Sequence, residues 1–203
     1  MDESPTGCWT NHHSIVEYKG QWYIFYHHND YSPEFDKNRS ARIDTIGFNP
    51  DGTIIKVIPT LRGVGNSDAR TQIQIDRYSE IAPTASIAYL NEANKFDGWK
   101  TLFKKSGAWV RYNRVEFGQE PVKQVKFRVL APKGAKLEVS IAGGKSIATV
   151  NVPRSNNWEI VSAPVKKSPT GLQDLKITLK SGLLKIIFKI KIVYLCFSTK
   201  KES

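Results

Sequence analysis

Residues 15–26 read IVEYKGQWYIFY, two short runs of apolar and aromatic residues on either side of a Lys-Gly pair. Alternation of this kind around a tight turn is typical of a β-hairpin. The later NPDG at residues 49–52, followed by TIIKVI, predicts a second hairpin turn, because its glycine can adopt positive φ and its proline fixes φ at the first corner. We therefore expect about four strands in roughly the first 60 residues, the size of one propeller blade.

A second set of strands is expected beyond residues 61–69, LRGVGNSDA, where Gly, Asn and Asp interrupt the strand pattern. About seven turn-bounded strands at roughly ten-residue spacing predict a β-sandwich there. These segments begin at Thr71 and continue as GAWVRYNRVEFG, KQVKFRVLAP, AKLEVSIAGG, ATVNVP, NWEIVSAPV and LQDLKITLKSG. Because no long apolar segment has helical spacing, the expected class is all-β. The expected domains are 1–64 and 70–197, with 198–203 as a disordered tail.

The net charge of +11 raises the question of a nucleic-acid ligand. Much of the excess lies in residues 180–203, which hold six lysines and one acid. Other basic residues are spread along strand-like segments such as VKQVKFRV, where alternation places charges on the solvated face of a half-buried sheet. We expect a solvated face here rather than a phosphate-binding patch.

Targeting and membrane signals are sparse in this sequence. Cys8 and Cys196 match no metal-binding spacing and indicate no compartment. The first residues, MDESPTGC, have neither the basic nor the apolar region of an export signal, so we expect none in this chain. The apolar segment LLKIIFKIKIVYLCF contains three lysines and is too short and too charged to span a membrane. We expect it to be an edge or final strand.

Three motifs in order, NHHSIVEYKGQWYIFYH, NRSARID and FNPDGTI, resemble the C-terminal part of a family 43 glycoside hydrolase of the xylosidase and arabinofuranosidase group. From about residue 70, IQIDRY, GAWVRYNRVEFG, NNWEIVSAPV and LQDLKITL resemble a family 6 carbohydrate-binding module. The resemblance covers roughly residues 8–182. It implies one or two incomplete blades of a β-propeller followed by a jelly-roll sandwich. It also implies a parent family whose members are typically secreted or periplasmic.

The same resemblance implies that catalysis in the family needs an Asp base, a second Asp and a Glu acid, all from earlier blades. Inversion requires two carboxyl groups about 6.5–9.5 Å apart across the sugar, with room for a water. Asp30, Glu34, Asp36 and Asp44 have no motif partner in this sequence. We therefore expect no catalytic residue in this chain.

Two residues of the first segment correspond to binding positions of the family. In the Asn-His-x-Ser pattern, His12 corresponds to a histidine at the central cavity of the propeller, where the family holds water or a calcium ion. A neutral imidazole can donate through one nitrogen and ligate through the other. Arg39 corresponds to an arginine near the sugar subsite, where its planar fork can bind adjacent hydroxyls. The alternatives are an exposed histidine and a surface arginine, and His27 and His28 are expected in a loop rather than as ligands.

Aromatic residues of the second segment are candidates for sugar stacking, because a sugar ring offers apolar C–H faces. Trp158 corresponds to a tryptophan that stacks on the sugar in the family. Phe103 occupies the region of a tyrosine that the family places across the cleft, and Trp99 lies nearby in sequence. Core packing is the alternative for all three residues. Trp109, which shares a strand face with Arg111, is expected in the core.

The segment IQIDRY stands where the family shows a Glu-x-Glu pair that holds calcium, and the two positions here are Gln74 and Asp76. The resemblance therefore implies a structural calcium ion at these residues, although an amide has replaced one carboxylate. After LKITLKSG the family continues with an Asn-bearing loop and an Asp-Trp strand, neither of which is present. Because that Asn completes the sugar cleft, we expect weak binding.

The sequence as a whole predicts a carbohydrate-binding fragment of a glycoside hydrolase that acts on xylan or arabinoxylan. One alternative is an active arabinofuranosidase or xylosidase whose missing blades come from another chain. The other is a basic nucleic-acid-binding β protein, which predicts an affinity that falls steeply with salt. No membrane partner is expected, and the oligomeric state is not indicated.

Overall fold

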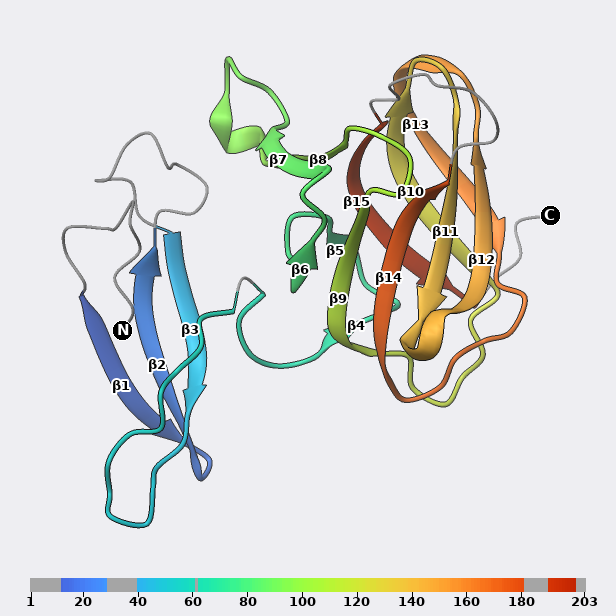
Figure 1. Cartoon of the computed structure of the whole chain (residues 1–203). Coiled ribbons are helices and arrows are strands. Elements are labelled where there is room, and N and C mark those ends of the chain that lie inside the picture. The colour runs from blue at the N-terminus through green and yellow to red at the C-terminus, as the bar shows by residue number, and fades with distance from the viewer. Residues whose placement is uncertain (1–11, 29–39, 61, 181–189, 200–203) are drawn as a thin grey trace. The chain divides into compact units, whose positions relative to one another are not determined.

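The computed structural model of the chain describes residues 12–28, 40–60, 62–180 and 190–199. The chain divides into two compact units, residues 1–64 and 65–203. Regular structure in the described residues is almost entirely β-strand, in one three-stranded sheet and two six-stranded sheets (Figure 1). The expected all-β class is confirmed. Among the described residues, no helix has the length and apolar character needed to cross a membrane.

The N-terminal unit is an antiparallel sheet with the strand order β1-β2-β3. Its strands are β1 (His13–Tyr18), β2 (Gln21–His28) and β3 (Ser40–Ile46). The connection between β1 and β2 is a two-residue turn in which Lys19 and Gly20 both have positive φ, 52° and 76°. Such a turn matches the right-handed twist of the strands it joins. The predicted hairpin is confirmed.

The second predicted turn also forms, but the strand expected after it does not. The amide of Asn49 donates to the carbonyl of Thr53 at 2.8 Å, and Gly52 has a φ of 83°. Within residues 53–60, the regular pairing is limited to an isolated bridge between Ile54 and Phe48. The outgoing segment folds back over the sheet instead, where Val57 packs against the small core. The expectation of a fourth strand here is therefore wrong.

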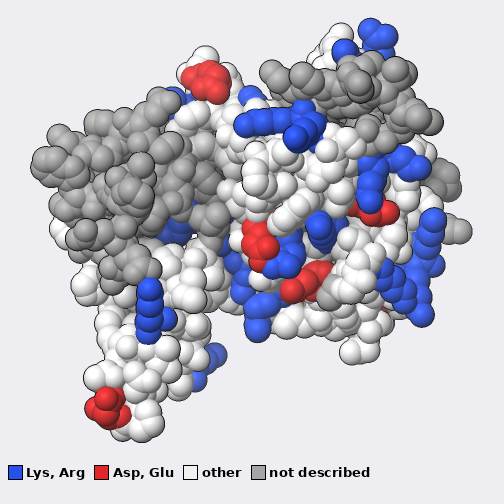
Figure 2. Space-filling model, in the orientation of Figure 1, with Lys and Arg blue, Asp and Glu red and all other residues white. Residues whose placement is uncertain are grey.

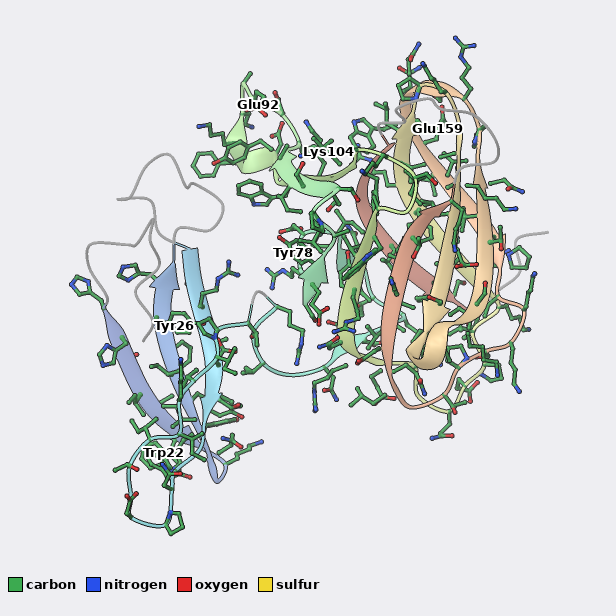
Figure 3. The ribbon with its side chains drawn as sticks, in the orientation of Figure 1. Trp22, Tyr26, Tyr78, Glu92, Lys104 and Glu159 are labelled. Atoms are coloured by element: carbon green, nitrogen blue, oxygen red, sulfur yellow. The ribbon has the colours of Figure 1, made fainter. Side chains whose placement is uncertain are left out.

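The core of the N-terminal unit is small and contains a buried carboxylate. Ile24, Tyr26 and Ile46 form the apolar cluster. Asp44, 5% exposed, accepts hydrogen bonds from the Tyr26 hydroxyl at 2.5 Å and from the backbone amide and hydroxyl of Thr60 at 3.1 and 2.5 Å. Asp44 thereby ties the segment after the turn to the sheet. Tyr26 is labelled on β2 in Figure 3.

The C-terminal unit contains the two six-stranded sheets. The first has the order β13-β10-β15-β8-β7, with β5 also paired to β15. The second has the order β12-β11-β14-β9-β4, with β6 also paired to β9. The strands of the first sheet are β5 (Ile73–Gln74), β7 (Ala85–Tyr89), β8 (Trp99–Phe103), β10 (Gln124–Ala131), β13 (Ser155–Pro164) and β15 (Ile190–Ser198). Those of the second sheet are β4 (Ser67–Asp68), β6 (Glu80–Ile81), β9 (Trp109–Glu116), β11 (Ala135–Ile141), β12 (Lys145–Val152) and β14 (Leu172–Lys180). Short 3-10 helices span Lys95–Asp97 and Ala142–Gly144.

Alternation along the strands builds the sandwich core. In β10, every second residue from Val125 to Ala131 is buried, and the intervening residues are partly exposed. In β14, Leu175, Ile177 and Leu179 are buried in the same way. Residues that alternate between core and solvent are the pattern of a sheet with one packed face. The predicted β-sandwich is confirmed.

The final strand occupies an interior position in its sheet. β15 pairs with β10 on one side and with β8 on the other. Leu195 and Phe197 are 0% and 2% exposed, so the end of the chain contributes to the core. The apolar tail is therefore a final strand but not an edge strand. Residues 181–189 lie outside the described residues, as do residues 200–203 of the expected tail, whereas Ser198 ends β15.

Candidate functional site

Trp158 lies near the start of β13, in a segment held by local hydrogen bonds. The hydroxyl of Ser155 accepts from the Asn157 amide at 3.0 Å and also lies 3.0 Å from the Glu159 carboxylate. Val161 and Ala163 of the same strand are buried, so alternation places Trp158 on the outer side of the sheet with Ile160, which is 66% exposed. Glu159 marks this end of β13 in Figure 3. The indole is thus half-buried on the outer face of the module.

A basic side chain lies beside the Trp158 indole. The guanidinium carbon of Arg128, on the neighbouring strand β10, is 5.5 Å from the centroid of the indole ring. This distance is within the range of a cation–π contact, which holds an aromatic ring in a defined orientation. An indole positioned in this way, next to a multivalent hydrogen-bond donor, can stack on a sugar ring while the donor binds a hydroxyl.

Phe103 belongs to the core, contrary to the expectation that it contacts a ligand. Its side chain is 0% exposed and is among the largest fully buried side chains of the chain. It ends β8, where its backbone pairs with Ala85 on one side and Ile190 on the other. Burial between paired strands removes the ring face that a sugar would need. The prediction of a stacking role for Phe103 is wrong for this structure.

Trp99 forms a stacked pair with Tyr89, a residue that the sequence analysis did not identify. The ring centroids are 4.3 Å apart and the planes are inclined by 25°. Tyr89 and Trp99 face each other across the β7–β8 hairpin, and the Lys95 ammonium lies 4.9 Å from the Tyr89 ring centroid. The pairing could have been recognised from the apolar runs on either side of residues 90–98, had they been read as a hairpin.

The loop at the end of this hairpin is ordered by its own polar side chains. Asp97 accepts hydrogen bonds from the side-chain amides of Asn91 and Asn94, at 2.8 and 2.5 Å. The loop presents Phe96, whose side chain is 100% exposed. Figure 3 shows Glu92 at the tip of this hairpin and Lys104 just after β8. The hairpin therefore carries a partly exposed aromatic pair on a preorganised support.

Trp109 lies on the outer face of the second sheet and is not a core residue. Its strand neighbour Val110 is fully buried, whereas Trp109 is partly exposed and the Lys176 ammonium lies 4.5 Å from its ring centroid. Arg111, on the same face, forms an ion pair with Glu80 of β6. The expectation of a core tryptophan is wrong. The charged Arg111 two residues later is the signal that could have indicated an outward face.

Polar atoms beside Trp109 have unused hydrogen-bonding capacity. The Nε of Arg111 and the Oδ1 of Asn113 are buried and have no hydrogen-bond partner among the described residues. An indole surrounded by a guanidinium, a carboxylate and an amide has the composition of a sugar-binding surface. The outer face of β9 is therefore a second candidate for sugar contact, separate from Trp158.

The two binding residues expected in the N-terminal unit have different outcomes. His12 is exposed just before β1, and its ring lies edge-on to that of His27, with centroids 5.7 Å apart. His27 and His28 are both in β2 and not in a loop, contrary to expectation. Arg39 lies outside the described residues. The family role implied for His12 stays a prediction.

The residues expected to hold calcium do not form an adequate set of ligands. Gln74 is exposed at the end of β5, and Asp76 is partly buried two residues later. Burial raises the pKa of the Asp76 carboxyl, because desolvation disfavours its charged form. Within residues that the structure describes, no three His, Cys, Asp or Glu side chains are grouped as a metal site. One amide and one carboxylate provide fewer charged oxygens than calcium takes, so these residues do not fit the ion.

We expect calcium to leave the stability of the chain almost unchanged. The melting temperature should differ by less than about 1 °C between millimolar calcium and a chelator, because a ligand stabilises only when its concentration exceeds its Kd. Differential scanning calorimetry under the two conditions measures this difference. A rise of several degrees with calcium that disappears in Asp76→Asn would contradict this expectation and restore the ion implied by the resemblance.

Comparison with known proteins identifies the class of the C-terminal unit. The family model for carbohydrate binding module (family 6) matches residues 71–191, more than half of the chain. The chain therefore belongs to the family 6 carbohydrate-binding modules. A family 6 module from Clostridium cellulolyticum, solved in complex with xylose, has a similar fold, with a TM-score of 0.56 and 20% identity over 65% of this chain and 99% of that one.

The similarity to glycoside hydrolases extends beyond the module. A glycoside hydrolase family 43 arabinoxylan arabinofuranohydrolase from Bacillus subtilis, solved with cellotetraose, matches with a TM-score of 0.66 and 22% identity over 94% of this chain and 41% of that one. Xylosidase/arabinosidase 43A of Humicola insolens is 41% identical over 55 residues, 27% of this chain and 17% of the relative. The chain spans less than a third of the length of the curated relatives it matches. The expected resemblance to a family 43 enzyme with a family 6 module is confirmed.

Proposed function

We propose that the chain binds xylan or arabinoxylan and supplies the polysaccharide-binding part of a xylan-active glycoside hydrolase. Membership of the family 6 carbohydrate-binding modules supports a carbohydrate ligand. The names of the relatives include a beta-xylosidase and an arabinoxylan arabinofuranohydrolase, and they support xylan as the class of carbohydrate that the chain binds. The observation that carries the proposal is the outward Trp158 indole, which lies beside Arg128 near the start of β13.

Sugar contact in this proposal is made by outward aromatic rings. Trp158 provides a stacking face for one sugar residue, and Arg128 is close enough to donate to a hydroxyl. The partly exposed Trp99, supported by Tyr89, is a further contact residue for a longer chain. Because Phe103 is buried and offers no exposed ring face, the affinity is expected to be low.

The charge distribution favours a sugar over nucleic acid. On the face seen in Figure 2, lysines and arginines are separated by uncharged surface and by acids instead of forming one continuous patch. Two basic residues are also engaged with acids, Arg111 with Glu80 and Lys180 with Glu138. A protein that follows a phosphate backbone typically clusters its Lys and Arg side chains on one face, where they neutralise several phosphates together. Sugar stacking requires only exposed rings and a few polar groups.

Trp158→Ala is expected to lower the affinity for xylo-oligosaccharides by at least about tenfold, because truncation of a central aromatic contact removes most of its stacking energy. The change is measured by titrating the full chain with xylo-oligosaccharides at two salt concentrations. Calorimetry and tryptophan fluorescence both monitor the titration. Trp22→Ala, in the N-terminal unit, is the matched control and should bind normally. Trp109→Ala tests the second candidate surface for sugar contact, the outer face of β9.

Each competing function has its own outcome in these titrations. Undiminished binding in Trp158→Ala would exclude this indole as the contact, and a loss confined to Trp109→Ala would assign binding to β9. An affinity that falls steeply between the two salt concentrations would indicate a polyanion ligand and contradict the proposal. Release of xylose or arabinose from a chromogenic glycoside by the purified chain would show an activity beyond binding.

A further inference from the structure

The edge strand β1 lacks the features that usually protect an exposed edge. Among the described residues, β2 is its sole neighbour in the sheet (Figure 1), and the β1–β2 register runs without a bulge. Its sequence, HSIVEY, contains neither proline nor lysine, and every residue in it is exposed. Natural proteins usually block such an edge with a proline, a lysine, a bulge or a covering segment, because its backbone groups can pair with another strand.

The opposite edge of the same sheet is covered in its middle. The segment that follows the sheet passes close to β3, where a Cβ at Gly63 would lie 3.4 Å from the carbonyl oxygen of Ile43. Hydrogen bonds from Thr60 to Asp44 hold this segment against β3. An added strand would collide with the segment at β3, whereas the exposure of all six residues of β1 leaves that edge accessible.

The turn geometry decides which backbone groups of β1 point outward. The two-residue turn with positive φ at Lys19 and Gly20 is closed by a hydrogen-bonded pair, Tyr18 and Gln21. Hydrogen-bonded and non-hydrogen-bonded pairs then alternate along the antiparallel ladder. Every second residue of β1 therefore turns its backbone toward β2. The others turn their backbone N–H and C=O groups to the outer edge, and these are His13, Ile15 and Glu17.

These three residues are complementary to themselves in one antiparallel register. When β1 is paired with β1 of a second copy about a twofold axis at Ile15, outward backbone groups meet outward backbone groups throughout. His13 then lies opposite Glu17 of the second copy, and the symmetry repeats this pair. A histidine ring donates to a carboxylate in both its neutral and its protonated form, so each pair is favourable. A shift by two residues in either direction breaks both pairs.

The side chains in this register are already suited to pairing. Ile15, which is 41% exposed, would lie against Ile15 of the second copy and bury apolar surface. One oxygen of Glu17 accepts a hydrogen bond from the Gly20 amide at 2.9 Å, which holds the carboxylate beside the turn. A carboxylate fixed in this way loses little further freedom when it meets its partner.

We propose that β1 is a dimerisation edge, at which two copies of the chain join their N-terminal sheets in the strand order β3-β2-β1-β1-β2-β3. The occupant is a second copy because the outward backbone groups and the donor and acceptor side chains of β1 match those of the same strand reversed. Twofold symmetry uses the β1 edge of both copies, so this contact closes at two chains.

A dimer would carry two C-terminal modules. If each binds sugar as proposed above, the two together raise the apparent affinity for a long polysaccharide that engages both, and leave the affinity for a short oligosaccharide unchanged. This consequence rests on the proposed function, whereas the pairing of β1 does not. Weak binding by a single module is therefore compatible with retention on a polymer.

Sedimentation equilibrium of the full chain over a wide range of concentrations tests the pairing. We expect the average mass to rise from that of one chain toward that of two. Glu17→Lys replaces the acceptor of His13 by a cation and should weaken dimerisation by at least about tenfold, because symmetry introduces the change twice. The double variant His13→Glu/Glu17→Lys restores an opposite-charge pair and should dimerise about as well as the unaltered chain. Glu92→Lys makes the same change of charge at an exposed site in the C-terminal unit, and is the matched control.

Hydrogen exchange of individual backbone amides tests the register itself. At concentrations where the dimer forms, the amides of Ile15 and Glu17 should exchange more slowly than in the dilute chain. The amide of Val16, which faces β2, should be unaffected. Ile15→Pro removes one outward donor and no bond to β2, so it should abolish the dimer while the sheet stays folded.

Four results would overturn the proposal. One is the mass of a single chain at all concentrations, and another is a mass that rises beyond two chains, which would show open association. The third is undiminished dimerisation in Glu17→Lys, and the fourth is a failure of the folded double variant to recover it. Circular dichroism confirms the fold of each variant. A dimer that binds long xylan no better than short oligosaccharides would count against the sugar-binding function and leave the β1 pairing intact.

Discussion

Asp44→Ala is expected to unfold the N-terminal unit while the C-terminal unit keeps its structure. Asp44 is 5% exposed and accepts hydrogen bonds from Tyr26 and twice from Thr60. Its loss removes the carboxylate that accepts from the buried Tyr26 hydroxyl, at a cost of about 1–3 kcal/mol, and releases the exposed Thr60 from the sheet. The apolar core that must offset this cost consists of three buried side chains and Val57. A small unit of this kind has only a few kcal/mol of stability to lose.

Hydrogen exchange followed by mass spectrometry measures this effect in each unit separately. Peptides from residues 13–60 should lose protection in Asp44→Ala, whereas peptides from residues 109–180 should exchange as before. Asp51→Ala is the matched control, because Asp51 also accepts from a nearby threonine but lies on an exposed turn. It should leave protection almost unchanged. Equal protection in Asp44→Ala and the unaltered chain would show that the carboxylate does not hold the segment to the sheet.

Phe103→Ala should destabilise the C-terminal unit by about 3–5 kcal/mol, because it removes a large side chain from a site that is 0% exposed. Chemical denaturation of the full chain, followed by tryptophan fluorescence, measures the free energy of unfolding. The backbone of Phe103 pairs with strands on both sides, so the cavity has little freedom to collapse. The loss should be smaller in Phe103→Leu, which retains most of the buried volume.

Phe103→Tyr separates the core role from the sugar-contact role that the sequence predicted. A hydroxyl at a fully buried position without a partner costs about 1–3 kcal/mol, so this variant should be less stable. Sugar affinity should be unchanged in the folded Phe103→Tyr and Phe103→Leu variants. Tighter binding in Phe103→Tyr without a loss of stability would restore the stacking role and show that the ring reaches the ligand.

Strand patterns in this chain were predictable from sequence where one face of a strand is buried. The alternation in QVKFRVLA corresponds to β10, and that in WVRY to the first half of β9 before the irregularity at Arg114, because residues two apart point to the same face. The failure of the expected fourth strand to form among the described residues of the N-terminal unit was not predictable in this way. TIIKVI has the composition of a strand, but pairing depends on a neighbour with a free edge and on contacts such as those of Val57 and Thr60.

Aromatic residues at the candidate sites show why composition alone does not assign function. The resemblance implied a stacking position for both Phe103 and Trp158, yet one is fully buried and the other is partly exposed on the outer face. Trp109 was expected in the core, but the strand face that it shares with Arg111 is partly exposed. Burial depends on which strands lie on either side of a residue, and those neighbours are distant in sequence.

The sequence by itself determined the all-β class, the first hairpin and the sandwich, because alternation and turn residues act over short distances along the chain. The resemblance of its motifs indicated the family of the module. The tertiary structure alone decided which rings face solvent, that the last strand lies inside a sheet, and that His12 faces His27. These features depend on strand pairing between distant segments. Local patterns constrain such pairing, and packing of the whole unit selects it.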